Sequence, residues 1–260
     1  MKTVISVTDL TYKANKQKIV DNISFFINRG DFTCFMGPNG AGKSTVIKLL
    51  CGLLKPYSGI ASVMGKEIGA YNRKKLAALI SYVPQFSSGS IHFSVEEYIA
   101  TGRYPHQDML RGVSFKDKEC VAYAMEVTSV IKMRNRDIST LSGGERQRVM
   151  IAAALAQEAD ILLLDEPTIY LDPKSSMDIL ELLAKIHACG TTVVMVTHDI
   201  NQALMFGTGF IGIKKGAILF SETNPEKLAD SGKLDELFDT RFYKTQSCGI
   251  PQLLSQRSGI

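Results

Sequence analysis

The sequence has little of what marks membrane-spanning, fibrous or strongly charged proteins. It contains no run of about 18 consecutive apolar residues, so we expect no transmembrane helix. The formal net charge is only +4, which does not by itself indicate nucleic acid or an anionic membrane as a partner. Repeats and low-complexity segments are absent, and 45 % of the residues are hydrophobic against 22 % charged. This balance is typical of a soluble globular protein and excludes a disordered or collagen-like chain.

The cysteines are few and scattered: Cys34, Cys51, Cys120, Cys189 and Cys248. None forms a CxxC pair or lies near a histidine at the spacing of metal ligands. The odd number and the scatter predict buried thiols in a reducing compartment and exclude a disulfide scaffold. The polar stretch that soon follows Met1 favours a chain without a signal peptide.

The apolar spacing predicts strands and helices in alternation, which is the pattern of an α/β protein with a mostly parallel sheet. A length of 260 residues suits one domain, or one compact domain with an inserted lobe. Asp172 and Pro173 are expected to start a helix that Gly190 ends. The predicted strands are 4–7, 19–27, 32–36, 80–83, 161–164 and 192–197, and helices are predicted after Ser44, over 173–189 and over 225–238.

A glycine-rich loop between a predicted strand and a predicted helix matches the pattern GxxxxGK[ST]. Glycines let consecutive backbone amides turn toward phosphate oxygens, and the helix that follows points its N-terminus at the same anion. The lysine then reaches the β- and γ-phosphates, and the hydroxyl is placed to bind Mg²⁺. The alternative is a chance glycine turn beside a surface lysine. The loop consists of Gly37, Pro38, Asn39, Gly40, Ala41, Gly42, Lys43 and Ser44.

Two further segments carry candidate chemistry. Asp165 and Glu166 follow the apolar residues 162–164, at the end of a strand where ligands of α/β sheets bind. Asp165 is a candidate ligand in the coordination shell of Mg²⁺, and Glu166 is a candidate for activating the attacking water. Taken alone, the pair would be interpreted as a solvated acidic turn. Leu141-Ser142-Gly143-Gly144 opens a helix and forms a second anion site, or simply an N-cap with a flexible loop. A second anion site is expected if this segment contacts a nucleotide that is bound by a partner chain.

Together these motifs resemble the nucleotide-binding subunit of an ATP-binding cassette (ABC) transporter, whose signature is LSGG. The resemblance extends to about residue 240 and implies a RecA-like core with an antiparallel β-subdomain and a helical lobe. It also implies the cofactors ATP and Mg²⁺. The roles that it implies are an adenine-stacking aromatic at Tyr12, a nucleotide contact at Thr45, a Mg²⁺-contacting Q-loop glutamine at Gln85, a D-loop aspartate at Asp172 and a switch histidine at His198.

The resemblance also predicts domain boundaries and partners. Residues 1–85 and 158–223 would form the β-subdomain with the core, 86–157 the helical lobe, and 224–260 a C-terminal helix and tail. Two copies would enclose two MgATP molecules at the cytoplasmic face of the membrane. A permease dimer would insert a short helix between the lobes, and a solute-binding protein would act indirectly. No nucleic acid is expected. In the tail, Phe242 and Tyr243 are expected to pack on the core, with contact to a partner as the alternative.

Two segments resemble importers of iron–siderophore complexes, and to a lesser degree those of haem and vitamin B12. They are Gly102-Arg103-Tyr104-Pro105-His106 and Thr168-Ile169-Tyr170-Leu171-Asp172. A structural interpretation is also possible for each: a Gly/Pro helix break for the first segment, and apolar packing before an aspartate for the second. Importers of zinc, manganese or molybdate, an exporter, a soluble iron–sulfur assembly ATPase, and DNA-repair or translation ATPases remain alternatives. Glu145 departs from the glutamine common in the family, and Ile169-Tyr170 from its small pair.

Overall fold

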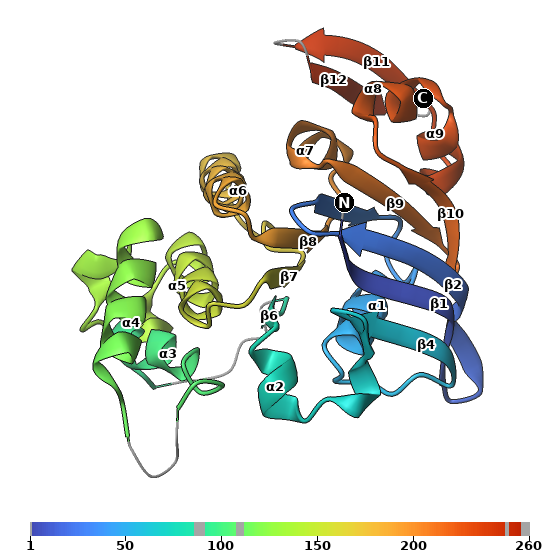
Figure 1. Cartoon of the computed structure of the whole chain (residues 1–260). Coiled ribbons are helices and arrows are strands. Elements are labelled where there is room, and N and C mark those ends of the chain that lie inside the picture. Colours follow the sequence, from blue (N-terminus) through green and yellow to red (C-terminus); the bar gives the residue numbers. More distant parts are fainter. Residues whose placement is uncertain (1, 86–91, 108–111, 248–249, 256–260) are drawn as a thin grey trace. The chain divides into compact units, whose positions relative to one another are not determined.

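The computed structural model describes residues 2–85, 92–107, 112–247 and 250–255 (Figure 1). The chain divides into two compact units, which are described separately. The first unit comprises residues 1–70 and 192–260, and the second comprises residues 71–191. The boundaries at residues 86 and 157 stay a prediction, and residues 86–91 at the start of the predicted helical lobe lie outside the described residues.

The first unit contains an antiparallel sheet in the order β2-β1-β4-β5 and strands that pair in the order β10-β9-β3-β8. β3 pairs in parallel with both β8 and β9, and all residues of β3 and β8 are buried. Burial on both faces explains why their sequences are almost entirely apolar, with the buried Thr33 and Thr192 as exceptions. The strands are β1 (Thr3–Ala14), β2 (Gln17–Asn28), β3 (Phe32–Met36), β4 (Ser58–Val63), β5 (Lys66–Glu67), β8 (Thr192–Val196), β9 (Gly209–Lys214) and β10 (Ala217–Glu222). The helices before the tail are α1 (Lys43–Leu50) and α7 (Ile200–Phe206).

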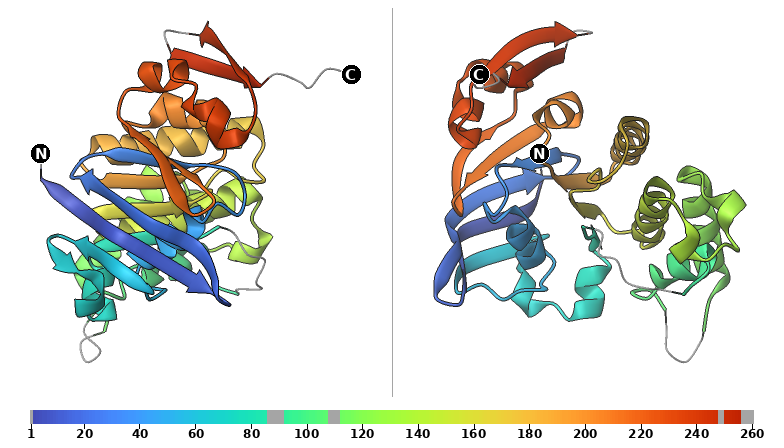
Figure 2. Two further views of the ribbon diagram at one scale, coloured as in Figure 1. Left: turned by 90° about the vertical axis from the view of Figure 1, so that its right-hand side faces the viewer. Right: turned by 180° about the vertical axis from the view of Figure 1, so that it is seen from behind.

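The C-terminal part of the first unit differs from the prediction. The single helix expected over 225–238 is wrong, because Gly232 adopts a positive φ of 68° and separates α8 (Pro225–Asp230) from α9 (Lys233–Phe238). An antiparallel hairpin follows, β11 (Phe242–Ser247) and β12 (Ile250–Ser255), as Figure 2 shows. Phe242 packs edge-on against Phe238 of α9, within the C-terminal segment itself, whereas Tyr243 is 54 % exposed, so the expectation that Tyr243 packs on the core is wrong.

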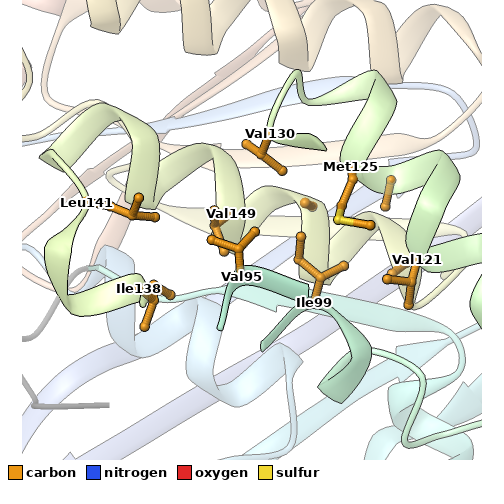
Figure 3. Close-up of a cluster of buried hydrophobic side chains, with 11 residues drawn as sticks. Val95, Ile99, Val121, Met125, Val130, Ile138, Leu141 and Val149 are labelled. Atoms are coloured by element: carbon orange, nitrogen blue, oxygen red, sulfur yellow. The ribbon is translucent and has the colours of Figure 1, made fainter. Parts of the chain in front are cut away.

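The second unit pairs β6 (Ile80–Val83) in parallel with β7 (Ile161–Asp165) and is otherwise helical. Three of its helices enclose an apolar cluster (Figure 3) that includes Val95, Ile99, Met125 and Val149. The predicted helical character of the lobe is therefore confirmed from residue 92 onward. The helices are α2 (Arg73–Ala77), α3 (Val95–Thr101), α4 (Phe115–Val127), α5 (Gly143–Ala156) and α6 (Pro173–Ala188). Asp172 caps α6 and Pro173 follows it, as predicted.

The expectations about membrane-spanning helices and about cysteine burial can be compared with the structure. Among the described residues, no helix is long and apolar enough to cross a membrane. The expectation of buried thiols holds for Cys34, whose burial raises its pKa to about 12, but Cys189 is exposed. Cys51 and Cys120 are partly buried, and Cys248 lies outside the described residues.

A buried ion-pair network holds the helices of the second unit together. Arg103 is only 1 % exposed, and its Nε donates to Asp117 Oδ1 at 2.8 Å. Its Nη1 donates to the carbonyl of Ala156 at 2.6 Å and to Glu158 Oε2 at 2.9 Å. The network therefore ties the segment after α3 to the start of α4 and the end of α5. Since a buried charge is costly unless it is paired, each of these partners is needed.

The carboxylate of Asp117 has a second role in the same network. It accepts hydrogen bonds from the hydroxyl and the amide of Ser114, at 2.6 and 2.9 Å, and so completes a capping box at the start of α4. The Ser114 hydroxyl and then the Arg103 guanidinium lower the pKa of Asp117 from 3.8 to about 2. Its contribution to stability is therefore present above pH 4 and is lost as the pH falls toward 2.

Replacing Arg103 tests this network. Arg103→Met should lower the free energy of unfolding by about 3–5 kcal/mol, because it leaves the buried Asp117 carboxylate without its cation. Arg134→Met is the matched control, since Arg134 pairs with Glu96 at 2.6 Å with both side chains largely exposed, and should cost about 0–1 kcal/mol. Urea unfolding measures both. Equal losses in the two variants would contradict the importance of the buried network.

Candidate functional site

The glycine loop of the first unit connects β3 to α1 and is pressed against neighbouring backbone. Gly37 has a φ of 148°, and a Cβ there would lie 2.0 Å from the carbonyl oxygen of Ile213. Gly42 has a φ of 101°, and a Cβ there would lie 2.6 Å from the carbonyl oxygen of Ile19. Any larger residue at either position would collide with backbone. Gly37 and Gly42 are therefore required by the local fold as well as by a phosphate ligand.

Lys43 places its ammonium group at the loop. The residue is 5 % exposed, and its Nζ donates to the carbonyls of Gly37 and Pro38 at 2.7 and 3.0 Å. α1 begins at Lys43 after Gly42, which has no side chain to cap the helix. By helix geometry the first-turn amides lack intrahelical acceptors, so they complete a set of donors around the loop. The arrangement suits an anion, and Ser44 follows in the same turn.

Two other predicted residues of the first unit lie near this loop along the strands. β8 pairs with β3, with Val196 opposite Phe35, and the amide of Thr197 donates to the carbonyl of Phe35 at 3.0 Å. The exposed His198 thus follows β8 at the edge where β3 leads into the loop. Tyr12 is half-buried on β1 opposite Val20, beside the Ile19 carbonyl that approaches Gly42. The fold brings both residues to the surroundings of the loop.

The second unit gathers the predicted glutamine and carboxylates at one end of its parallel strands. Val83 of β6 lies opposite Leu164 of β7, so the residues that follow the two strands are neighbours. Gln85 Nε2 donates to Glu166 Oε2 at 3.3 Å, which leaves the amide oxygen of Gln85 as a ligand atom. Asp165 ends β7 and is 2 % exposed. Glu166 adopts a positive φ of 50°, a conformation that is costly outside glycine and that accumulates at functional sites.

The signature segment forms the N-terminus of α5. Ser142 caps the helix: its Oγ accepts from the amide of Glu145 at 3.3 Å, and its own amide donates to Glu145 Oε2 at 2.8 Å. The backbone amide of Ser142 is the main cause of the lowered pKa of Glu145. Glutamate and glutamine both complete such a capping box. The departure from the family's glutamine at Glu145 therefore keeps the helix start intact.

The signature glycines lie against the segment that carries Asp172. A Cβ on Gly143 would meet Leu171 Cδ2 at 3.3 Å, and one on Gly144 would meet Ser175 Oγ at 3.1 Å. Ser175 in turn donates its hydroxyl to Asp172 Oδ2 at 2.5 Å, and this bond, with the Ser175 amide, lowers the pKa of Asp172. The structure thus joins the predicted signature and D-loop into one surface of the second unit. Ser175 was not singled out from the sequence, because a serine in the first turn of a helix is common.

The Gly-Arg-Tyr-Pro-His segment has a structural role in addition to its family resemblance. Arg103 is the centre of the buried network described above, and His106 Nε2 bonds with the carbonyl of Gln157 at 2.7 Å. The side chain of Gln157 donates to the carbonyl of Ile80 at 2.8 Å, at the start of β6. The segment therefore connects the helical lobe to the strand that leads to Gln85. Neither Gln157 nor Glu158 carried a sequence signal that could have identified it.

A glycine loop between a buried parallel strand and a helix, with a lysine at its centre, defines the class of P-loop nucleotide-binding proteins. Within that class, the chain belongs to the ABC transporter family, whose sequence pattern matches residues 20–169. It is an ABC-type ATPase with the mixed α/β fold of that family. The family expected from the motifs is thereby confirmed.

Individual relatives agree with this assignment. The ferric enterobactin transport ATP-binding protein FepC of Escherichia coli is 36 % identical, over 89 % of this chain and 86 % of its own. The structure of a metal-chelate type ABC transporter in an inward-facing conformation gives a TM-score of 0.85 at 27 % identity, and covers 99 % of this chain and 98 % of that one. An ATP-binding cassette solved as a dimer with ADP and phosphate gives a TM-score of 0.73 at 30 % identity, covering 84 % and 98 %.

The close approach at Gly37 can be tested by comparing it with Gly40, a loop glycine whose Cβ position has no close neighbour. Gly37→Ala should lower the free energy of unfolding by about 1–3 kcal/mol and weaken ATP binding, because the new methyl collides with the Ile213 carbonyl. Gly40→Ala is the control: Gly40 has a φ of 77° but no atom within 4 Å of its Cβ position, so only about 1 kcal/mol is expected. Urea unfolding and equilibrium binding of a fluorescent ATP analogue measure both variants. Equal effects at Gly37 and Gly40 would contradict the steric argument.

Proposed function

We propose that the chain is the ATP-hydrolysing subunit of an importer for iron–siderophore-type metal chelates. Two copies would close around two MgATP molecules, and the closure would drive the permease. The observation that carries this proposal is the similarity to a ferric enterobactin ATP-binding protein over 89 % of the chain. It is supported by the likeness to a metal-chelate type transporter over 99 % of the chain. Importers of haem, vitamin B12, zinc, manganese or molybdate would use the same chemistry.

In this proposal the first unit binds the nucleotide. The loop amides from Gly37 to Thr45 hold the phosphates, and Lys43 offsets the charge of the β- and γ-phosphates. Its present bonds to the carbonyls of Gly37 and Pro38 keep the ammonium in place for that role. Tyr12 stacks on the adenine, a contact that contributes about 0.5–1.5 kcal/mol beyond the area buried.

The donor set also fits Mg²⁺, which prefers oxygen ligands and keeps several waters. Ser44 offers a hydroxyl, Asp165 a carboxylate, and Gln85 an amide oxygen that its bond to Glu166 leaves exposed to a ligand. When bound, Mg²⁺ neutralises charge on the β- and γ-phosphate oxygens. The burial of Asp165 at a strand end favours pairing of its carboxylate with a cation.

The hydrolytic step needs positioning and one proton acceptor. Glu166 accepts a proton from the attacking water, and the bond from Gln85 holds its carboxylate in place. His198 contacts the γ-phosphate from the edge that carries the glycine loop. The bond from the γ-phosphorus to the water oxygen forms as the bond from the γ-phosphorus to the β-phosphate oxygen breaks. ADP and phosphate are then the two products.

A second copy of this chain would complete each site. Ser142, Gly143 and Gly144 of that copy would face the γ-phosphate, and Asp172 would lie at the interface. The Ser142 hydroxyl bonds to both the amide and the carboxylate of Glu145, so its contact with the phosphate would replace the bond to that carboxylate. A related cassette solved as a dimer with ADP and phosphate supports this arrangement.

The permease would dock on a hollow of about 170 Å³ in the second unit, at the cytoplasmic face of the membrane. The hollow lies beside the residues that lead to Gln85 and beside the Gly102 segment, so a helix seated there would influence both. A solute-binding protein would act only through the permease. The hollow is lined by Tyr82, Val83, Pro84, Tyr98, Thr101, Gly102, Met150, Ala153, Ala154 and Gln157.

The role of Glu166 is tested by an isosteric change. Glu166→Gln should bind ATP with unchanged affinity and lose about 10²–10⁴ in turnover, because an amide cannot accept the proton. Lys43→Ala is the comparison variant and should instead weaken ATP binding. Steady-state phosphate release and fluorescent nucleotide binding measure the two effects. Wild-type turnover in Glu166→Gln would rule out Glu166 as the general base.

The transport proposal is tested by co-purification from native membranes in mild detergent, followed by mass spectrometry. We expect a polytopic permease to be recovered with the wild-type chain and to be lost with Thr101→Arg, which places a charge in the exposed rim of the hollow. Tyr123→Arg, at an exposed position on α4, is the control and should retain the permease. Recovery of a soluble scaffold alone would overturn the transport role and favour an iron–sulfur assembly ATPase.

A further inference from the structure

Within the first unit, the Asn201 side chain bonds both backbone groups of one residue of the C-terminal hairpin, Leu253. Asn201 Nδ2 donates to the carbonyl of Leu253 at 3.1 Å, and the amide of Leu253 donates to Asn201 Oδ1 at 2.8 Å. The two residues are 52 positions apart. The Leu253 side chain is only 5 % exposed, so β12 is seated firmly beside α7 (Figure 2). Loss of Asn201 would leave both groups of Leu253 without these partners.

Asn201 lies in the first turn of α7, three residues after His198. The amide of Thr197 donates to the carbonyl of Phe35 at 3.0 Å, which holds the chain on β3 just before His198. Just after it, the amide of Asp199 donates to Thr197 Oγ1 at 3.0 Å, and Asp199 Oδ1 accepts from the amide of Gln202 to cap α7. The direction of the exposed His198 is thus set by Thr197 on one side and by the first turn of α7 on the other.

The two ends of α7 are held by different contacts. At its C-terminal end the amide of Gly207 donates to the carbonyl of Ala203 at 2.8 Å, and that carbonyl also meets the buried thiol of Cys34. At its first turn the bonds of Asn201 connect the helix to β12. Since α7 has only seven residues, a loosened first turn would tilt or fray the part of the helix that adjoins His198.

We propose that Asn201 is a positioning residue for His198, and that the hairpin Phe242–Ser255 supports the hydrolytic site through it. The inference rests on the proposed role of His198 in ATP hydrolysis. It assigns a function to the C-terminal segment, in which no motif was recognised. The hydrogen bonds of the Asn201 side chain described here go to Leu253 and not to the glycine loop, so its effect is expected on turnover and not on ATP affinity.

The first experiment compares three variants of the full chain by phosphate release and nucleotide binding. Asn201→Ala should lower kcat about three- to tenfold with the ATP dissociation constant unchanged, because His198 is misplaced and not removed. Asn201→Asp keeps the acceptor for the Leu253 amide and loses the donor, so an intermediate kcat is expected. Lys244→Ala removes a different contact of the hairpin, the 2.8 Å ion pair to Asp230, and leaves both partners of the Asn201–Leu253 bonds in place, so kcat should be unchanged.

The second experiment is a double-mutant cycle with His198→Ala, measured by single-turnover hydrolysis with enzyme in excess. If Asn201 acts through His198, then Asn201→Ala has no further effect in the His198→Ala background. Hydrogen exchange of residues 197–206 supplies an independent readout: exchange should be faster in Asn201→Ala and unchanged in Lys244→Ala.

The outcomes separate the positioning role from a purely structural one and from the proposed function. An unchanged kcat in Asn201→Ala, an equal loss of kcat in both His198 backgrounds, or an equal loss in Lys244→Ala would overturn the inference. Unchanged hydrogen exchange of α7 in Asn201→Ala would overturn it as well. A wild-type chain that hydrolyses no ATP, or a His198→Ala variant with full activity, would instead count against the proposed function.

Discussion

The parallel pairing of fully buried strands is the constraint on which the rest of the structure depends. β3 and β8 in the first unit, and β7 in the second, are buried at every position, so their side chains are mostly apolar on both faces. The exceptions are Thr33 within β3, and Thr192 and Asp165 at strand ends. The polar residues of the predicted site therefore lie mainly where a strand ends. Because parallel strands end at the same edge, the glycine loop and His198 are neighbours, and so are Gln85 and Glu166.

The helices of the second unit depend on a different constraint: the backbone amides at the start of each helix need hydrogen-bond acceptors. α3, α4 and α5 each begin with a serine and an acidic residue that form a capping box. Each box satisfies amides that would otherwise lack partners, at about 1 kcal/mol for a lost cap. One of these boxes contains Asp117, which also pairs with Arg103. The lobe is therefore fixed by caps and one buried cation in addition to its apolar cluster.

The parts of the fold that the sequence predicted are those with dense local signals. The strand at 80–83, the start of α6 at the cap Asp172 with Pro173 as its first residue, and the loop at residues 37–44 were identified because apolar runs, prolines and glycines have strong positional meaning. The helix expected over 225–238 failed because its apolar periodicity continues through Ser231 and Gly232, while the glycine conformation interrupts the backbone. The spacing of apolar residues indicates which face of a helix is buried, but it does not indicate where the backbone changes direction.

The roles that the sequence did not reveal depend on partners distant in sequence. Arg103 meets Glu158, and Asn201 meets Leu253, through contacts that no local pattern encodes. The signature could be interpreted from the sequence as an anion site or as a cap, and in the structure Ser142 is a cap that bonds to Glu145. Capping uses the hydroxyl and the amide of Ser142 and the amide of Glu145. The amides of Gly143 and Gly144 lack intrahelical acceptors by geometry. Structural capping and phosphate binding by these two glycine amides therefore draw on different atoms of one turn.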